Sequence, residues 1–104
     1  MTNSFTGILK VLVDHGISGS ATDVDFIMDH LHEGSSLAMT RFVDYALSLV
    51  SSSSGANRIR HYLFHGTLIQ RNYASLYLNR LGHWPEVKLA YEMGLIDAVQ
   101  AFAR

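Results

Sequence analysis

Glycine recurs along this 104-residue chain after segments whose apolar residues are spaced as in a helix. A glycine in that place favours the left-handed conformation that ends a helix, because it carries no Cβ. Tight turns of this kind set successive helices side by side as antiparallel neighbours. The glycines that we expect to end a helix are Gly16, Gly34, Gly66, Gly82 and Gly94.

Residues typical of helix starts complete the pattern. Thr67 and Gln70 form a capping box, in which each side chain bonds the backbone N–H of the other residue, and Thr22 with Asp25 resembles one. Pro85, the single proline, suits the first turn of a helix, where its missing N–H would have no partner anyway. These signals predict three helices that begin near these positions.

The first apolar segment, residues 8–13, is the one candidate for a strand. No second candidate exists to pair with it, and Ser4 and Gly16 bracket it as a helix. The serine-rich residues 51–55 predict a loop. The sequence thus predicts an all-α fold, a compact bundle or short stack of about six or seven antiparallel helices, in a single domain of residues 1–104.

Composition and missing motifs exclude several classes of function. The chain has no cysteine, which excludes disulfides, iron–sulfur clusters and cysteine nucleophiles. It has no P-loop, nucleophile elbow or EF-hand pattern, so we expect neither an enzyme nor a cofactor. The N-terminal apolar run is too short to cross a bilayer and lacks the features of a signal peptide, so we expect a soluble, cytoplasmic protein without membrane contact. Only 16% of the residues are charged, which favours a partner or a homo-oligomer.

Charge is unevenly distributed along the chain. Residues 1–57 hold six acidic and two basic side chains, a net −4, whereas residues 58–88 hold five basic and one acidic side chain, a net +4. Segregation of this kind produces a dipolar molecule. It predicts a basic surface, formed by residues 58–88, that binds an acidic surface of a partner protein.

Residues 68–81 predict a central helix. Its apolar residues cover an arc of about 200° at about 100° per residue, wide enough to pack against neighbours on two sides. Leu76, Tyr77 and Leu81 are expected in the core. The opposite side is a narrow polar strip, which we expect to be free to contact a partner. This strip consists of Arg71, Asn72, Ser75 and Asn79.

Two histidines and the one tryptophan in the basic half could also serve binding. His61 and His65 lie four residues apart on one helical face, a spacing that can chelate a metal ion. A third ligand is missing on that helix, and His83 is the nearest candidate in sequence, so we expect no native metal site. Trp84 lies in a predicted turn, where it either covers the core or anchors a partner.

Residues 70–99, QRNYASLYLNRLGHWPEVKLAYEMGLIDAV, resemble a HEAT-type helical repeat. In such repeats a helix that begins with Arg and small residues ends in Leu-Gly, and a second helix carries spaced Val, Leu and Ala with Asp near its end. Tyr73 departs from the pattern, which has a small residue in that place. The resemblance implies stacked helical hairpins and a protein-binding scaffold. The matching positions are Arg71, Ala74, Leu81, Gly82, Val87, Leu89 and Asp97.

We therefore expect a small non-enzymatic protein-binding domain, such as an adaptor, an inhibitor or an immunity-type factor. One alternative is a nucleic-acid-binding protein whose arginines contact phosphates while aromatic rings stack on bases. An isoelectric point near 6.6 argues against it, because dedicated binders are usually basic. A second alternative is metal binding through the histidine pair. The residues expected to contact the partner are Arg58, Arg60, His61, His65, Arg71, Asn72, Ser75, Asn79, Arg80 and Trp84.

Overall fold

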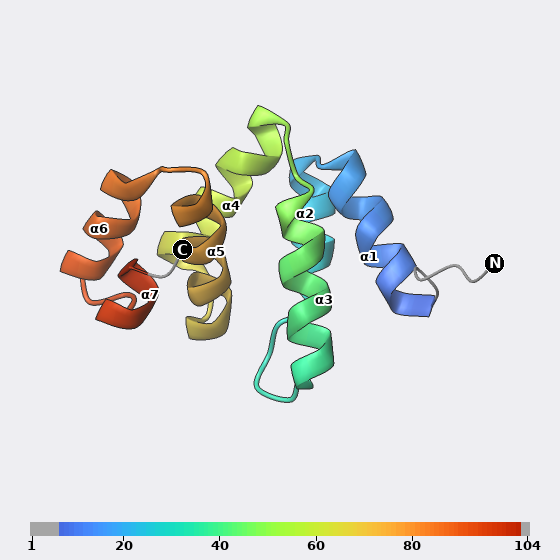
Figure 1. Cartoon of the computed structure of the whole chain (residues 1–104), viewed down its shortest axis with the longest axis horizontal. Coiled ribbons are helices and arrows are strands. Elements are labelled where there is room, and N and C mark those ends of the chain that lie inside the picture. The colour runs from blue at the N-terminus through green and yellow to red at the C-terminus, as the bar shows by residue number, and fades with distance from the viewer. Residues whose placement is uncertain (1–6, 103–104) are drawn as a thin grey trace. The chain divides into compact units, whose positions relative to one another are not determined.

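The computed structural model describes residues 7–102. Within that range the chain forms α-helices and no strand, which confirms the predicted all-α fold (Figure 1). Ser4, expected to bracket the first helix, lies outside the described residues. The helices are α1 (Gly7–Ser18), α2 (Ala21–Met28), α3 (Leu37–Ser48), α4 (Ser53–His65), α5 (Leu68–Arg80), α6 (Trp84–Glu92) and α7 (Ala98–Phe102).

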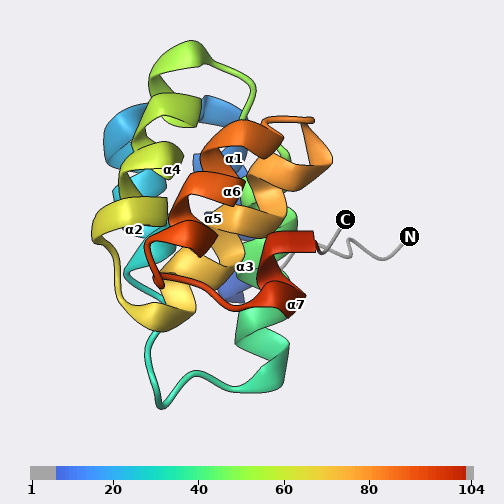
Figure 2. The same ribbon diagram turned by 90° about the vertical axis from the view of Figure 1, so that its left-hand side faces the viewer.

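Packing divides the helices into two units, Met1–Arg58 and Ile59–Arg104, and the division falls inside α4. In the first unit, α1 packs on α2 and α3, and α2 packs on α3. In the second unit, α5, α6 and α7 pack on one another, and Figure 2 turns α6 and α7 toward the viewer. The assignment of residues 1–104 to one domain stays a prediction.

A glycine lets α1 and α3 lie in close contact. Gly16 is buried, and a Cβ added to it would lie 2.3 Å from the carbonyl oxygen of Ala46 in α3. Leu12 of α1 and Leu47 of α3 are almost completely buried. The prediction that Gly16 ends the first helix is therefore wrong. The helix continues beyond it, and Gly19, with a φ of +67°, follows its end.

The capping box of α2 lies two residues earlier than predicted. Ser20 is the N-cap, and its backbone N–H donates to Asp23 Oδ2 at 2.9 Å. Asp23 also lies against the ring of His15, with Oδ1 2.6 Å from Nδ1. The predicted pairing of Thr22 with Asp25 is wrong, because Ser20 already occupies the cap and Asp23 receives the additional bond from α1.

The signals predicted around α5 and α6 are confirmed. Thr67 and Gln70 form the capping box of α5, and the Thr67 N–H donates to Gln70 Oε1 at 2.9 Å. Pro85 lies in the first turn of α6. Gly82 and Gly94 follow α5 and α6 with φ of +80° and +77°, the left-handed conformation expected of them. Each of these features depends only on residues nearby in the chain.

Other turns differ from prediction. Gly34 and Gly66 do not adopt a positive φ. Gly66 is followed at once by the N-cap of α5, so α4 passes into the next helix without a left-handed residue. The loop predicted for residues 51–55 is shorter, because α4 already begins at Ser53. Gly55 is buried inside α4, where a Cβ would lie 2.2 Å from the carbonyl oxygen of Gly19, between α1 and α2.

Candidate functional site

Two of the arginines assigned to the basic surface are paired with carboxylates. Arg58 Nε donates to Asp25 Oδ1 at 2.6 Å within the first unit. Within the second unit Arg60 pairs with Glu86, and its Nη2 lies 3.2 Å from His83 Nδ1. These carboxylates offset the positive charge that the sequence placed on a binding surface, so neither arginine presents an unbalanced cation there.

Arg71 holds the second unit together. Its Nε donates to the carbonyl oxygen of Leu95 at 2.7 Å, and its Nη1 donates to the carbonyl oxygen of Gly66 at 2.9 Å. The side chain thereby ties the start of α5 to the loops that follow α4 and α6. Hydrogen bonds from a charged donor are among the stronger ones in proteins. Arg71 is therefore engaged in holding the second unit together.

Two of the four residues of the polar strip predicted on α5 are buried, and Arg71 and Asn72 are half-buried. Ser75 and Asn79 are 0% and 2% exposed. Ser75 Oγ donates to the carbonyl oxygen of Asn72 at 2.7 Å, and Asn79 Nδ2 donates to the carbonyl oxygens of Gln100 and Ala101 at 3.1 and 3.2 Å. The prediction that Ser75 and Asn79 are free to contact a partner is wrong, because α5 packs against both α6 and α7.

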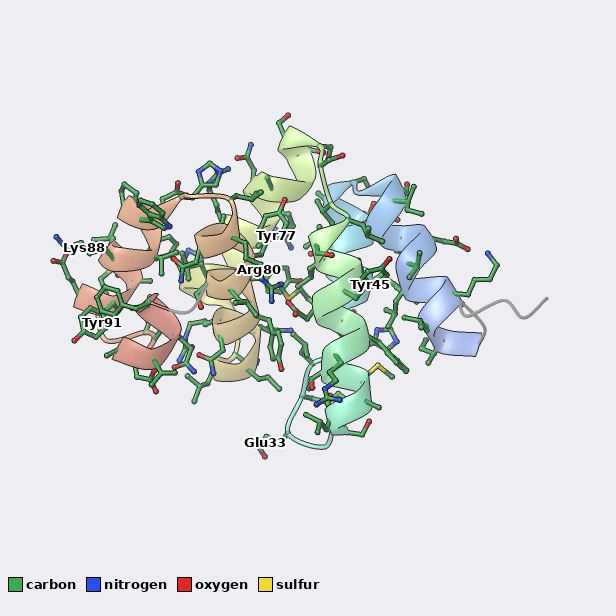
Figure 3. The ribbon with its side chains drawn as sticks, viewed as in Figure 1. Glu33, Tyr45, Tyr77, Arg80, Lys88 and Tyr91 are labelled. Carbon is green, nitrogen blue, oxygen red and sulfur yellow. The ribbon has the colours of Figure 1, made fainter. Side chains whose placement is uncertain are left out.

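The residues predicted in the core near the end of α5 match the structure only in part. Tyr77 is 5% exposed, as predicted, and burial raises the pKa of its hydroxyl. Leu81, also predicted in the core, is 54% exposed, and that prediction is wrong. It is the C-cap residue, where the chain turns away from the apolar arc of the helix. Arg80 is exposed beside it; Figure 3 labels Tyr77 and Arg80 on α5.

The two histidines of α4 lie together at the surface. His61 and His65 are both exposed, and their ring centroids are 4.8 Å apart. Within residues 7–102 no group of three or more histidine, cysteine or carboxylate side chains is placed to hold a metal ion. The structure thus brings the pair together as the spacing predicts and adds no third ligand from the described part of the chain.

Aromatic side chains gather in a hollow between α6 and α7, here called the α6–α7 groove, of about 650 Å³. Trp84, Tyr91 and Phe102 are 53%, 41% and 67% exposed. The ring centroids of Tyr91 and Phe102 are 6.2 Å apart, within the range of aromatic pairs. Trp84 was predicted either to cover the core or to anchor a partner, and its exposure favours the role of an anchor. The groove is lined by Trp84, Pro85, Lys88, Tyr91, Glu92, Ala101 and Phe102.

The start of α6 positions these side chains. The helix begins at Trp84, so that Trp84, Lys88 and Tyr91 lie at positions i, i+4 and i+7 on one face. Lys88 and Tyr91 both project from α6 in Figure 3. The Trp84 indole N–H donates to the carbonyl oxygen of Asn79 at 3.2 Å, which orients the ring. Sequence reasoning missed this face because it assigned Trp84 to a turn, although the spacing was the signal that could have revealed it.

Two charged residues of the groove have no partner within the described part of the chain. Lys88 and Glu92 are exposed and lie one helical turn apart. Within residues 7–102 neither side chain makes an ion pair or a hydrogen bond. The groove therefore combines an aromatic lining with one cation and one anion that can each accept an opposite charge from a ligand.

None of the helices formed by residues 7–102 has the length and apolar character needed to cross a bilayer. Comparisons of the chain with protein-family models, with curated proteins and with solved structures find no match. What the protein does must therefore be inferred from the chemistry of the α6–α7 groove itself.

Proposed function

We propose that the protein is a protein-binding domain whose α6–α7 groove receives an amphipathic helix of its partner. The observation that carries the proposal is the exposure of three aromatic side chains, Trp84, Tyr91 and Phe102, along one hollow. Clustered apolar groups at a surface mark interaction sites. Aromatic residues also dominate the centres of protein interfaces, where each can bury about 150–250 Å².

The spacing of the anchors suits a helical partner. Trp84 and Tyr91 are separated by about two turns of α6, or about 10.5 Å along the helix axis. A second helix lying along the groove presents its own side chains at positions i and i+7 with the same interval. The groove lies between two helices, α6 and α7, which is the arrangement that receives an amphipathic helix in known complexes.

The two charged residues of the groove indicate which charges the partner helix should carry along its polar side. Lys88 favours an acidic side chain opposite it, and Glu92 favours a basic one. Because the two residues are one turn apart on α6, the matching acid and base should also lie about one turn apart on the partner helix. Such complementary charges set the register and direction of binding more than its strength.

The wider proposal is a non-enzymatic domain that acts in the cytoplasm as an adaptor, an inhibitor or an immunity-type factor. The helical-repeat resemblance of residues 70–99 supports it, because that family also serves protein binding. The engagement of Arg58, Arg60 and Arg71 within the fold moves the proposed surface from the basic residues to the groove. Nucleic-acid binding through those arginines stays an alternative prediction, with less support for the same reason.

The single tryptophan of the chain, Trp84, lies in the groove and is therefore a site-specific fluorescent probe. The ligand for the test is a designed amphipathic helical peptide of about 15 residues. It has leucines along one face and an acid and a base placed to meet Lys88 and Glu92. A second peptide has the acid and base exchanged. We expect the first peptide to shift the Trp84 emission to shorter wavelength at lower concentration than the second.

Two variants make the test specific to the groove. Exchanging the charges, Lys88→Glu with Glu92→Lys, should reverse the preference between the two peptides. Phe102→Ser should weaken binding by at least about tenfold, the effect of losing a modest interface anchor. Leu37→Ser is the matched control, since Leu37 is 68% exposed on α3 in the other unit. If neither peptide shifts the emission, or if the control weakens binding as much as Phe102→Ser, the proposal is wrong.

A further inference from the structure

The histidine pair on α4 has no part in the α6–α7 groove. His61 and His65 are exposed, and within residues 7–102 neither ring makes a hydrogen bond or an ion pair. Their ring nitrogens are therefore available to a ligand from solution. Neutral imidazole nitrogen is a preferred ligand of Zn²⁺, Cu²⁺ and Ni²⁺. Two such rings one turn apart on a helix can bind the same ion, as they do in helical zinc motifs.

The separation of the rings matches that required of a chelating pair. Zn²⁺ lies about 2.0–2.1 Å from an imidazole nitrogen, and about 3.2 Å from the ring centre. At N–Zn–N angles of about 90–110°, two ring centres then lie about 4.5–5.2 Å apart. The ring centroids of His61 and His65 are 4.8 Å apart. The distance between the two rings therefore lies within the range that a chelating pair requires.

The position of the pair along α4 also favours a cation. His65 is the last residue of this 13-residue helix, and His61 lies one turn before it. The carbonyl end of a helix carries a partial negative charge, which stabilises a positive ion within the last turn. An ion bound between these two side chains would sit beside that end of α4.

The pair lacks the further ligands that a closed zinc site requires, and a second copy of the chain would supply them. Structural zinc sites have four protein ligands in a tetrahedron, and the described part of the chain offers no third ligand beside the two histidines. Two copies related by a two-fold axis through the ion would contribute two imidazoles each. We propose that His61 and His65 form half of a zinc site, which a second copy completes, so that Zn²⁺ links two chains into a dimer.

The test is sedimentation velocity of the full chain, titrated with Zn²⁺ alone at neutral pH. We expect conversion of monomer to dimer, saturating at one ion per pair of chains and reversed by EDTA. Mg²⁺, which prefers oxygen ligands and octahedral geometry, should have no effect. His61→Ala and His65→Ala should each abolish the dimer. His32→Ala, at another exposed histidine, is the matched control and should dimerise as the wild type does.

Each alternative outcome counts against the inference. A dimer that forms without Zn²⁺ and resists EDTA, or one that persists in His61→Ala, would place the interface elsewhere. Binding of one ion per chain to a protein that stays monomeric would show that the pair acts without a second copy. Circular dichroism of the variants confirms that the helices are intact. This inference is independent of the groove, because its readout uses no peptide and no groove variant.

Discussion

Replacing Gly16 with alanine tests the close contact between α1 and α3. The added Cβ would lie 2.3 Å from the carbonyl oxygen of Ala46, about 1 Å inside ordinary van der Waals contact. Overpacking of a tight contact costs about 1–3 kcal/mol, and the upper end applies because a backbone oxygen cannot rotate aside. The better helix propensity of alanine offsets about 1 kcal/mol of this. We therefore expect Gly16→Ala to lower the free energy of unfolding by about 2 kcal/mol.

Urea unfolding followed by circular dichroism measures this difference as a lower transition midpoint. Gly34→Ala is the matched control, since a Cβ there would meet only the side chain of His32, at 3.3 Å, and no backbone atom. Its effect should stay within about 0.5 kcal/mol. A Gly16→Ala variant as stable as the wild type, or more stable, would refute the reasoning, because helix propensity alone would then decide the outcome.

Three further substitutions test the hydrogen bonds that define the ends of the helices. The pKa of Asp23 is held far below its usual value, first by the hydroxyl of Ser20. Because the pKa is lowered on folding, this stabilisation is fully present above about pH 4 and is lost as the pH falls. Asp23→Asn should therefore cost about 1 kcal/mol at neutral pH and lose less stability than the wild type in an acid titration followed by circular dichroism. Arg71→Met leaves two backbone carbonyls without their donor and should lower the free energy of unfolding in urea by about 1–3 kcal/mol. Thr67→Ala removes the N-cap of α5 and should cost about 1 kcal/mol in the same assay, and Thr22→Ala, which removes no cap, should cost less.

Features that depend on neighbouring residues could be predicted from the sequence. The capping box of Thr67 and Gln70, the first-turn Pro85 and the left-handed Gly82 each follow from the chemistry of one turn of chain. Gly16 differs, because its role is set by a helix from a later part of the chain. On its own sequence it looks like any glycine after an apolar segment, and only the position of α3 shows that it must lack a side chain.

The candidate site was harder to predict for the same reason. Charge counts cannot show that Arg58 meets a carboxylate 33 residues away, or that Arg71 meets a carbonyl 24 residues away. Ser75 and Asn79 form a polar strip on the wheel of a single helix, but α7 packs against that helix and Asn79 bonds its backbone. The sequence indicates the spacing of Trp84, Lys88 and Tyr91, but a helix expected to open at Pro85 leaves Trp84 in a turn, and the start of α6 at Trp84 places it on their face.

The shortest of the described helices should limit the temperature range in which the groove persists. Helix α7 has five residues, fewer than an isolated helix needs to persist in water. Hydrogen bonds from Asn79 to its last carbonyls help to hold it to α5. Its amide protons should therefore exchange with solvent faster than those of α5, through local opening that leaves the rest of the unit folded. Since α7 supplies Phe102, warming should remove one wall of the groove, and with it the affinity for a partner, before the other helices unfold.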